Sequence, residues 1–232
     1  MNTSAIVLLS GGQDSTTCLH HAIAKHGADE IVAVSVEYGQ RHAAELAAAT
    51  EIAKAAGVRH VILDTSVLTQ LGDSALVTSE AIEAKGGRVD AEMPEGLPTS
   101  FVPGRNMIML AFAAAVAVKH NTRLIYTGVC QTDFSGYPDC RRDFIDAMQE
   151  AATLAMPSSA GPIKIVTPLM DLTKGETVKM ARALGDACWS ALALSVTCYH
   201  GQRPGCGKCP ACELRAKGFA EAGEIDPAEG VA

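Results

Sequence analysis

The stretch from Ser10 to Ser15, with the sequence Ser-Gly-Gly-Gln-Asp-Ser, combines residue types that hold phosphate groups. Gly11 and Gly12 allow unusual backbone angles and a close approach of phosphate oxygens to the chain. Asp14 stands out, because a carboxylate repels a phosphate unless Mg²⁺ bridges the two. The combination predicts a nucleotide bound together with its metal. The stretch is not a Walker A loop, because no Gly-Lys-Ser/Thr follows it.

Four cysteines near the C-terminus form a second candidate for chemistry. Cys198, Cys206, Cys209 and Cys212 lie within fifteen residues, among glycines and prolines. A closed zinc site with four thiolates is the first interpretation, and we expect this segment to be disordered without its metal. An iron–sulfur cluster fits the Cys-x₂-Cys-x₂-Cys spacing, and redox thiols or disulfides are the third possibility.

The other four cysteines have more ordinary interpretations. Cys18 and Cys188 lie in apolar surroundings, where a buried small side chain is the usual role. Cys130 and Cys140 flank a glycine-containing loop, where either a nucleophile or a packing residue would fit.

The elements around the glycine stretch predict a parallel α/β fold. Apolar runs of strand length at 4–9, 30–37, 60–64, 123–128 and 163–166 alternate with helical segments at 16–24, 40–56, 106–119 and 141–154. This alternation is typical of parallel strands joined by right-handed crossovers. Ligands bind beyond the carboxyl ends of such strands, and the glycine stretch occupies this position at the start of a helix.

The C-terminal part contains one clear helix start. Thr173 and Glu176 have the spacing of a capping box, which predicts a helix that ends near Leu184. We therefore expect a doubly wound, mainly parallel sheet with flanking helices over residues 1–187. A small zinc-binding segment and tail follow over residues 188–232.

Composition limits the partners and the compartment. The 232 residues are 48% hydrophobic, and the net charge is 19 − 26 = −7, without a dense basic run. Direct nucleic-acid binding is not expected, because it needs clustered Lys and Arg. We find neither a signal peptide nor an apolar run long enough to span a membrane, and we expect a cytoplasmic protein with reduced cysteines. Residues 65–103 have a weak pattern and form either a lid or a surface excursion.

The glycine stretch resembles the pyrophosphate-binding loop (PP-loop) of ATP pyrophosphatases, which cleave ATP between its α and β phosphates. Three further stretches, at 38–42, 101–106 and 127–141, and the cysteine cluster narrow the resemblance from this broad superfamily to one family. Together they resemble the 7-cyano-7-deazaguanine synthase family of queuosine biosynthesis, from about Ile6 to Gly218. The resemblance implies an adenine nucleotide alpha hydrolase-like fold. It also implies a ligase that converts 7-carboxy-7-deazaguanine, ammonia and two ATP to the nitrile, two AMP and two pyrophosphate.

This resemblance assigns roles to individual residues. Asp14, as the Mg²⁺ ligand, and Arg105, as the partner of a phosphate or of the substrate carboxylate, are the expected catalytic residues. The expected nucleotide-binding residues are Leu9, Ser10, Gly11, Gly12, Gln13, Asp14, Ser15, Thr16, Thr17, Cys18 and Leu19. The expected substrate-binding residues are Asp133, Tyr137, Asp139 and Arg141. The expected zinc ligands are Cys198, Cys206, Cys209 and Cys212.

Several of these roles have structural alternatives. Arg105 could form a surface salt bridge instead, and Asp133 and Asp139 could cap the turn and the following helix. Lys174 either reaches phosphate or marks a solvated helix start. Gln40 or Arg41 faces the nucleotide, whereas His42 is interpreted as an ordinary helix residue.

Rival functions remain within the same superfamily and outside it. They are a tRNA-modifying thiolase, another adenylating amide ligase, and a zinc module that binds ATP without turnover. A thiolase would need a basic surface for RNA, which the charge of −7 disfavours. No glutaminase domain is evident at this length, so we expect ammonium from solution or from a partner. We also expect a homodimer.

Overall fold

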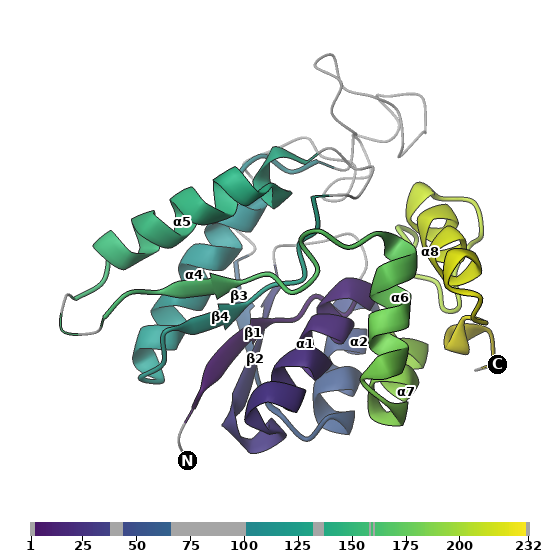
Figure 1. The fold of residues 1–232 in the computed structure, drawn as a ribbon, viewed down its shortest axis with the longest axis horizontal. Helices are drawn as coiled ribbons and strands as arrows, with labels where there is room; N and C mark the ends of the chain where they lie inside the picture. The colour runs from purple at the N-terminus through teal and green to yellow at the C-terminus, as the bar shows by residue number, and fades with distance from the viewer. Residues whose placement is uncertain are drawn as a thin grey trace.

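The computed structural model describes residues 3–37, 44–65, 101–131, 137–157, 159 and 161–230 (Figure 1). The stretch Tyr38–His42, most of the predicted lid at 65–103 and the substrate-binding candidate Asp133 lie outside the described residues.

A five-stranded sheet forms the centre of the fold, and all of its strand pairs are parallel. The strands are β1 (Ala5–Leu8), β2 (Ile31–Glu37), β3 (Arg59–Asp64), β4 (Leu124–Tyr126) and β5 (Lys164–Val166). Their order is β3-β2-β1-β4-β5, so the chain reverses direction across the sheet between β1 and β4. The predicted doubly wound sheet is confirmed, and β1 lies at the switch point where such folds bind ligands.

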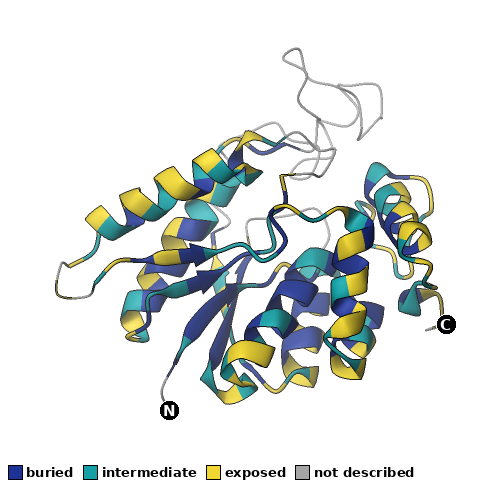
Figure 2. Ribbon diagram, in the orientation of Figure 1, coloured by how far each residue is buried: buried dark blue, intermediate teal, exposed yellow. Residues whose placement is uncertain are grey.

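Apolar side chains along β1 point alternately to the two faces of the sheet, which explains why helices cover both faces. Ala5 and Val7 pack in one apolar cluster, and Ile6 packs in the other. The first cluster includes α1 (Gln13–His26), α2 (Ala44–Ala55) and α7 (Asp186–Leu194), whereas α4 (Arg105–Lys119) and α5 (Arg142–Leu154) form the second (Figure 1). Because both faces are covered, the central strands β1 and β2 are almost entirely buried, whereas the edge strand β3 is partly exposed, with Ile62 at 45%. Most exposed residues lie on the outer helix faces (Figure 2).

The predicted helix start at Thr173 is confirmed, and Gly27 marks the end of α1. Gly27 ends α1 with a φ of 86°, a conformation that favours glycine. Thr173 caps α6 (Lys174–Ala183): its Oγ1 accepts from the Glu176 N–H at 3.3 Å, and the Glu176 carboxylate accepts from the Thr173 N–H at 2.8 Å. This capping box fixes the first turn of α6.

Two C-terminal helices, α7 and α8 (Pro210–Ala222), have no counterpart in the sequence prediction. They join α6 in a third apolar cluster, which includes Val178, Leu192 and Phe219. The expected boundary between residues 187 and 188 falls inside α7. The division of the chain into two segments stays a prediction. No helix among the described residues has the length and apolarity that crossing a membrane requires.

Candidate active site and metal centre

The PP-loop follows β1 and runs directly into α1. Gly11 has a φ of 91°, and a Cβ atom there would lie 2.1 Å from the Glu45 carbonyl oxygen and 2.8 Å from the Ala49 nitrogen. A side chain would therefore be strained by the backbone angle and would collide with α2. The loop takes its shape because glycine lets α2 pack directly against it.

Hydroxyl groups hold the loop in this shape. The Ser15 hydroxyl donates to the Gly12 carbonyl oxygen at 3.0 Å and accepts from the Ser10 N–H at 3.2 Å. The Thr16 hydroxyl also donates to the Gly12 carbonyl, at 2.8 Å. The loop is therefore closed by its own side chains, and the first N–H groups of α1 are left for an anion.

Four further side chains of the predicted nucleotide segment, those of Leu9, Thr17, Cys18 and Leu19, are buried in the protein. Leu9, Cys18 and Leu19 belong to the apolar core, and the Thr17 hydroxyl donates to the Gln13 carbonyl oxygen at 3.1 Å. Burial raises the pKa of the Cys18 thiol far above its usual range. A ligand would thus meet this segment at its first turn, and the side chains that follow support that turn.

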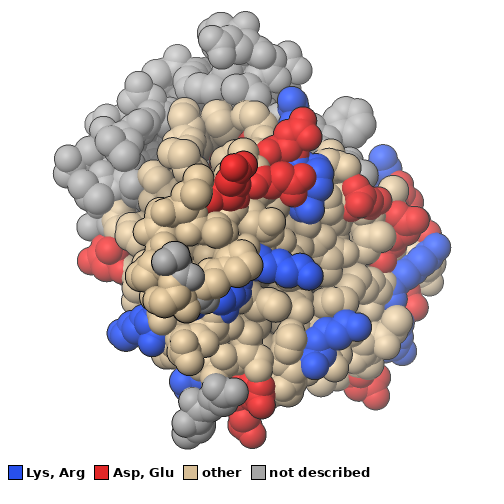
Figure 3. All heavy atoms as spheres, turned by 60° about the vertical axis from the view of Figure 1, so that its left-hand side comes forward, with Lys and Arg blue, Asp and Glu red and all other residues tan. Residues whose placement is uncertain are grey.

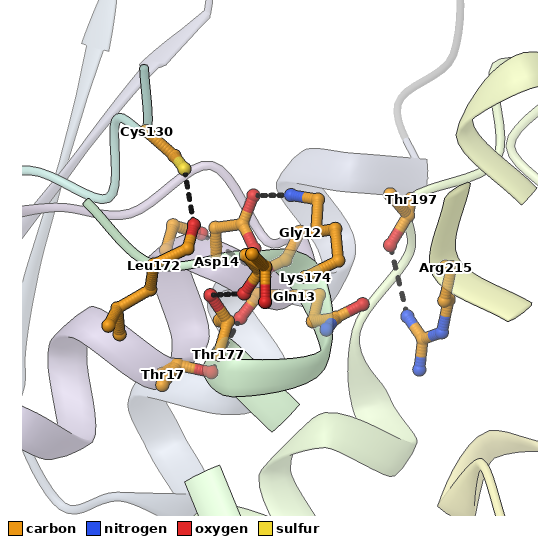
Figure 4. Close-up of polar contacts among 12 residues, drawn as sticks. Gly12, Gln13, Asp14, Thr17, Cys130, Leu172, Lys174, Thr177, Thr197 and Arg215 are labelled. Atoms are coloured by element: carbon orange, nitrogen blue, oxygen red, sulfur yellow. Dashed lines mark hydrogen bonds and ion pairs between the residues drawn. The ribbon is translucent and has the colours of Figure 1, made fainter. Parts of the chain in front are cut away.

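Asp14 lies in this first turn, opposite the start of α6. One of its carboxylate oxygens forms an ion pair with the Lys174 ammonium (Figure 4). The other oxygen, Oδ1, is buried and has no hydrogen-bond partner within the described part of the chain. A buried carboxylate oxygen without a donor suits a cation, so the residues present fit a Mg²⁺ ion bound here.

A neighbouring loop supports the start of α6. The Cys130 thiol donates to the Leu172 carbonyl oxygen at 3.0 Å (Figure 4). Gln131 adds a hydrogen bond from its N–H to the Met170 carbonyl oxygen and another from its amide to Asp171, at 3.0 and 2.7 Å. Cys130 is buried, and these contacts support its interpretation as a packing residue.

Three of the predicted substrate residues are described. Asp139 is buried, and its carboxylate accepts from the Asn106 N–H at 3.2 Å. Asp139 therefore binds the first turn of α4, whereas α5, the helix that follows it, begins without a side-chain cap; the structural alternative to substrate binding is thus a contact with α4. Burial raises the pKa of Asp139, and the Asn106 hydrogen bond and the Arg105 charge oppose this effect. The Tyr137 ring lies 5.6 Å from the Phe101 ring, and Arg141 is exposed just before α5.

Arg105 connects the two halves of the site through its charge. It begins α4, and its guanidinium lowers the pKa values of both Asp139 and Glu45. Burial outweighs this effect at Glu45, and the pKa of its carboxyl group is raised to about 7. Glu45 was missed by the sequence prediction, although it lies in the first turn of α2 against Gly11. An acidic residue in a first helical turn was its only sequence signal.

The four predicted metal ligands come together. The sulfurs of Cys198, Cys206, Cys209 and Cys212 all lie within 4.8 Å of one another, and the Cys206 and Cys212 sulfurs are 3.9 Å apart. Four thiolates about 2.3 Å from one zinc ion lie about 3.8 Å from each other, so the donor set fits such an ion. The Lys208 N–H donates to the Cys206 sulfur, and this bond, with further hydrogen bonds from Cys209 and Cys198, lowers the pKa of that thiol to about 7 against the effect of burial.

A short connection joins the metal centre to the PP-loop. The Val196 N–H donates to the Gly11 carbonyl oxygen at 2.9 Å, two residues before Cys198. On the other side, the buried Arg215 of α8 donates to the Ser195 hydroxyl at 2.8 Å and to the Thr197 hydroxyl at 3.0 Å; Figure 4 shows the second contact. Arg215 also binds both carboxylate oxygens of Asp226. The C-terminal segment is thus tied into the site.

A doubly wound parallel sheet with a Ser-Gly-Gly-x-Asp-Ser loop at its switch point defines a nucleotide-binding protein of the PP-loop type. A family model described as "Queuosine biosynthesis protein QueC" matches residues 4–223, and the chain belongs to this family.

The relatives extend over almost the whole chain. The protein of Chromobacterium violaceum named 7-cyano-7-deazaguanine synthase is 49% identical over 223 residues, which cover 96% of this chain and 92% of that protein. The Laribacter hongkongensis protein of the same name is also 49% identical, with 96% and 93% covered. The Bacillus subtilis protein of this name is 46% identical over 219 residues, with 94% of each chain covered.

Proposed function

We propose that this chain is an ATP-dependent ligase that converts 7-carboxy-7-deazaguanine and ammonia to 7-cyano-7-deazaguanine, a queuosine precursor. The observation behind the proposal is Asp14 with its buried, unpartnered oxygen in the first turn of a PP-loop helix, within the described residues. Relatives at 46–49% identity that carry the synthase name support the substrate assignment.

The reaction requires the same activation twice. A carboxylate oxygen of the substrate attacks the α-phosphorus of ATP, pyrophosphate leaves, and an acyl adenylate forms. Ammonia then attacks the carbonyl carbon, and AMP leaves to give the amide. The amide oxygen attacks a second ATP in the same way. Loss of AMP and of two N–H protons leaves the nitrile.

In this chemistry the protein positions the reactants and neutralises phosphate charge, and no residue of the protein forms a covalent intermediate. In our proposal the first turn of α1, with Ser10, Gly11, Gly12 and Ser15, binds the pyrophosphate part of ATP. Asp14 holds Mg²⁺, which neutralises phosphate charge when bound. Both adenylations use the same loop, because the acid and the amide present an oxygen at the same position.

The substrate side of the site is formed by the loop after β4. We assign base recognition to Tyr137 and Arg141, together with Asp133, which lies outside the described residues. Arg105 faces the substrate carboxylate or a phosphate, and its planar fork suits either anion. The buried Asp139 orients α4 and, through it, Arg105.

The metal, the nitrogen donor and the assembly complete the proposal. One zinc ion occupies the four-cysteine site in a structural role, because four thiolates close the tetrahedron and leave no position for water. Ammonium is the nitrogen donor, and the protein is a homodimer. The cytoplasm suits a chain in which none of the eight cysteines, all of them within the described residues, forms a disulfide.

The rival thiolase is less well supported. On the face shown in Figure 3, the Lys and Arg side chains are scattered among uncharged residues, and those described there form no continuous basic patch. RNA binding usually uses a continuous basic surface.

The test follows AMP and pyrophosphate release after addition of 7-carboxy-7-deazaguanine and ammonium. We expect release that depends on both compounds, with two AMP for each nitrile. ATP binding without AMP release that depends on the substrate would contradict the proposal and favour a non-catalytic module.

A further inference from the structure

Lys174 occupies an unusual position for a lysine. It is the first residue of α6, where the helix dipole disfavours a cation. Its side chain is 12% exposed and forms its ion pair with Asp14 in the first turn of α1. The ammonium is therefore held where two helix N-termini meet, next to the proposed Mg²⁺ ligand.

A close crossing of α6 and α8 fixes this lysine. A Cβ atom at Gly218 of α8 would lie 2.9 Å from the Lys174 Cβ and 3.3 Å from its carbonyl carbon and oxygen. On the other side of the crossing, a Cβ atom at Gly175 would lie 2.8 Å from the Cβ of Glu221. Gly223, at the end of α8, has no such neighbour within 4 Å. The two helices can come this close because each has a glycine at the crossing: Gly218 lies against Lys174, and Gly175 lies against Glu221.

The position of α8 is set at its other end by the metal centre. Cys209 is the N-cap of α8, and Cys212 lies in its first turn. One turn further, Arg215 binds Asp226, Ser195 and the Leu192 carbonyl oxygen. A metal bound by the four cysteines therefore fixes the helix that carries Gly218.

We propose that the four-cysteine segment positions the phosphate site: it fixes α8, and Gly218 of α8 places Lys174 at the PP-loop as a phosphate ligand. Before the nucleotide binds, Asp14 neutralises the ammonium. When Mg²⁺ takes the Asp14 carboxylate, the ammonium turns to a phosphate oxygen within reach. This inference rests on the proposed function, because the phosphate is that of ATP.

The test is a double-mutant cycle on the full, zinc-loaded chain, with the dissociation constant of Mg·ATP measured by calorimetry. Lys174→Met removes the ammonium, and we expect binding about tenfold weaker, the loss of one charged hydrogen bond. Gly218→Ala is expected to weaken binding similarly while one zinc ion per chain is retained. The double variant is expected to bind no more weakly than Lys174→Met, because Gly218 acts through Lys174.

Lys217→Ala is the matched control. This neighbour of Gly218 is exposed and pairs with Glu221 on the surface of α8, so its loss should not change Mg·ATP binding. Gly218→Ala with unchanged affinity, or a double variant in which the two effects multiply to about a hundredfold, would overturn the inference.

A second measurement covers the case in which Gly218→Ala does not hold zinc. The wild-type chain is stripped of zinc by a chelator and returned to Mg²⁺ without zinc. We expect the stripped wild type to bind Mg·ATP about tenfold more weakly and stripped Lys174→Met to lose nothing further. Unchanged binding by the stripped wild type would overturn the inference. A zinc-loaded wild type that does not bind Mg·ATP would instead refute the proposed function.

Discussion

Replacing Gly11 with alanine tests the shape of the PP-loop with a matched control beside it. At a φ of 91° an L-residue costs about 1–2 kcal/mol. The new Cβ would lie 2.1 Å from the Glu45 carbonyl oxygen. Helix α2 would then have to retreat by about 1 Å or more, and overpacking of this kind costs about 1–3 kcal/mol. The sum is about 2–5 kcal/mol of lost free energy of unfolding, or about 4–20 °C in Tm.

Gly12→Ala is the control for this change. Gly12 has a φ of −81°, and its added Cβ would lie 3.5 Å from the Ser10 hydroxyl, an ordinary contact. We expect its free energy of unfolding to stay within about 1 kcal/mol of the wild type in urea titrations followed by circular dichroism. If both variants unfold at the same urea concentration, the packing of α2 against the loop is not what requires glycine.

Three further changes test other parts of the structure. Cys209→Ala should yield protein without zinc and with a protease-sensitive C-terminal segment, and full zinc occupancy with unchanged proteolysis would refute the metal assignment. The folded pKa of Glu45, raised from 4.5 to about 7, means that the folded chain binds the extra proton, so its free energy of unfolding should fall as pH rises through this window. Glu45→Gln should remove that part of the pH dependence, and a variant whose urea midpoint varies with pH as in the wild type would show that the pKa of Glu45 is not raised. Asp14→Asn should lower turnover by about a thousandfold while far-ultraviolet circular dichroism stays that of the wild type, and retained activity would remove its metal role.

The sheet and its helices could be predicted because their signals are local. Apolar runs such as 30–37 are buried on both sheet faces, and Gly27 and Thr173 mark helix ends by their own chemistry. The four cysteines were also predictable, because their spacing within fifteen residues leaves few geometries for a tetrahedral ion.

The missed features depend on contacts between distant residues. Helix α8 begins at the end of a stretch rich in glycine, proline and cysteine, and this context hid its local signals, Pro210 at the start and Gly223 at the end. Phe219 packs in the apolar cluster with α6 and α7, and Arg215 binds the Leu192 carbonyl oxygen of α7. The carboxylate of Asp139 accepts a hydrogen bond from the N–H of Asn106 in the first turn of α4, and Asn106 lies 33 positions earlier in the chain. Asp14 and Lys174 are 160 residues apart, and their pairing depends on tertiary contacts such as the close crossing of α6 and α8. No local pattern encodes such distances.

The central claim is that the acid and the amide are both activated by adenylation, and oxygen labelling tests it most directly. With both carboxylate oxygens of 7-carboxy-7-deazaguanine replaced by oxygen-18, each activation transfers one of them to a departing AMP. Mass spectrometry should find one oxygen-18 in each of the two AMP molecules formed per nitrile, and none in pyrophosphate. Label in only one of the two AMP molecules, or ADP and labelled phosphate in place of AMP, would contradict the account.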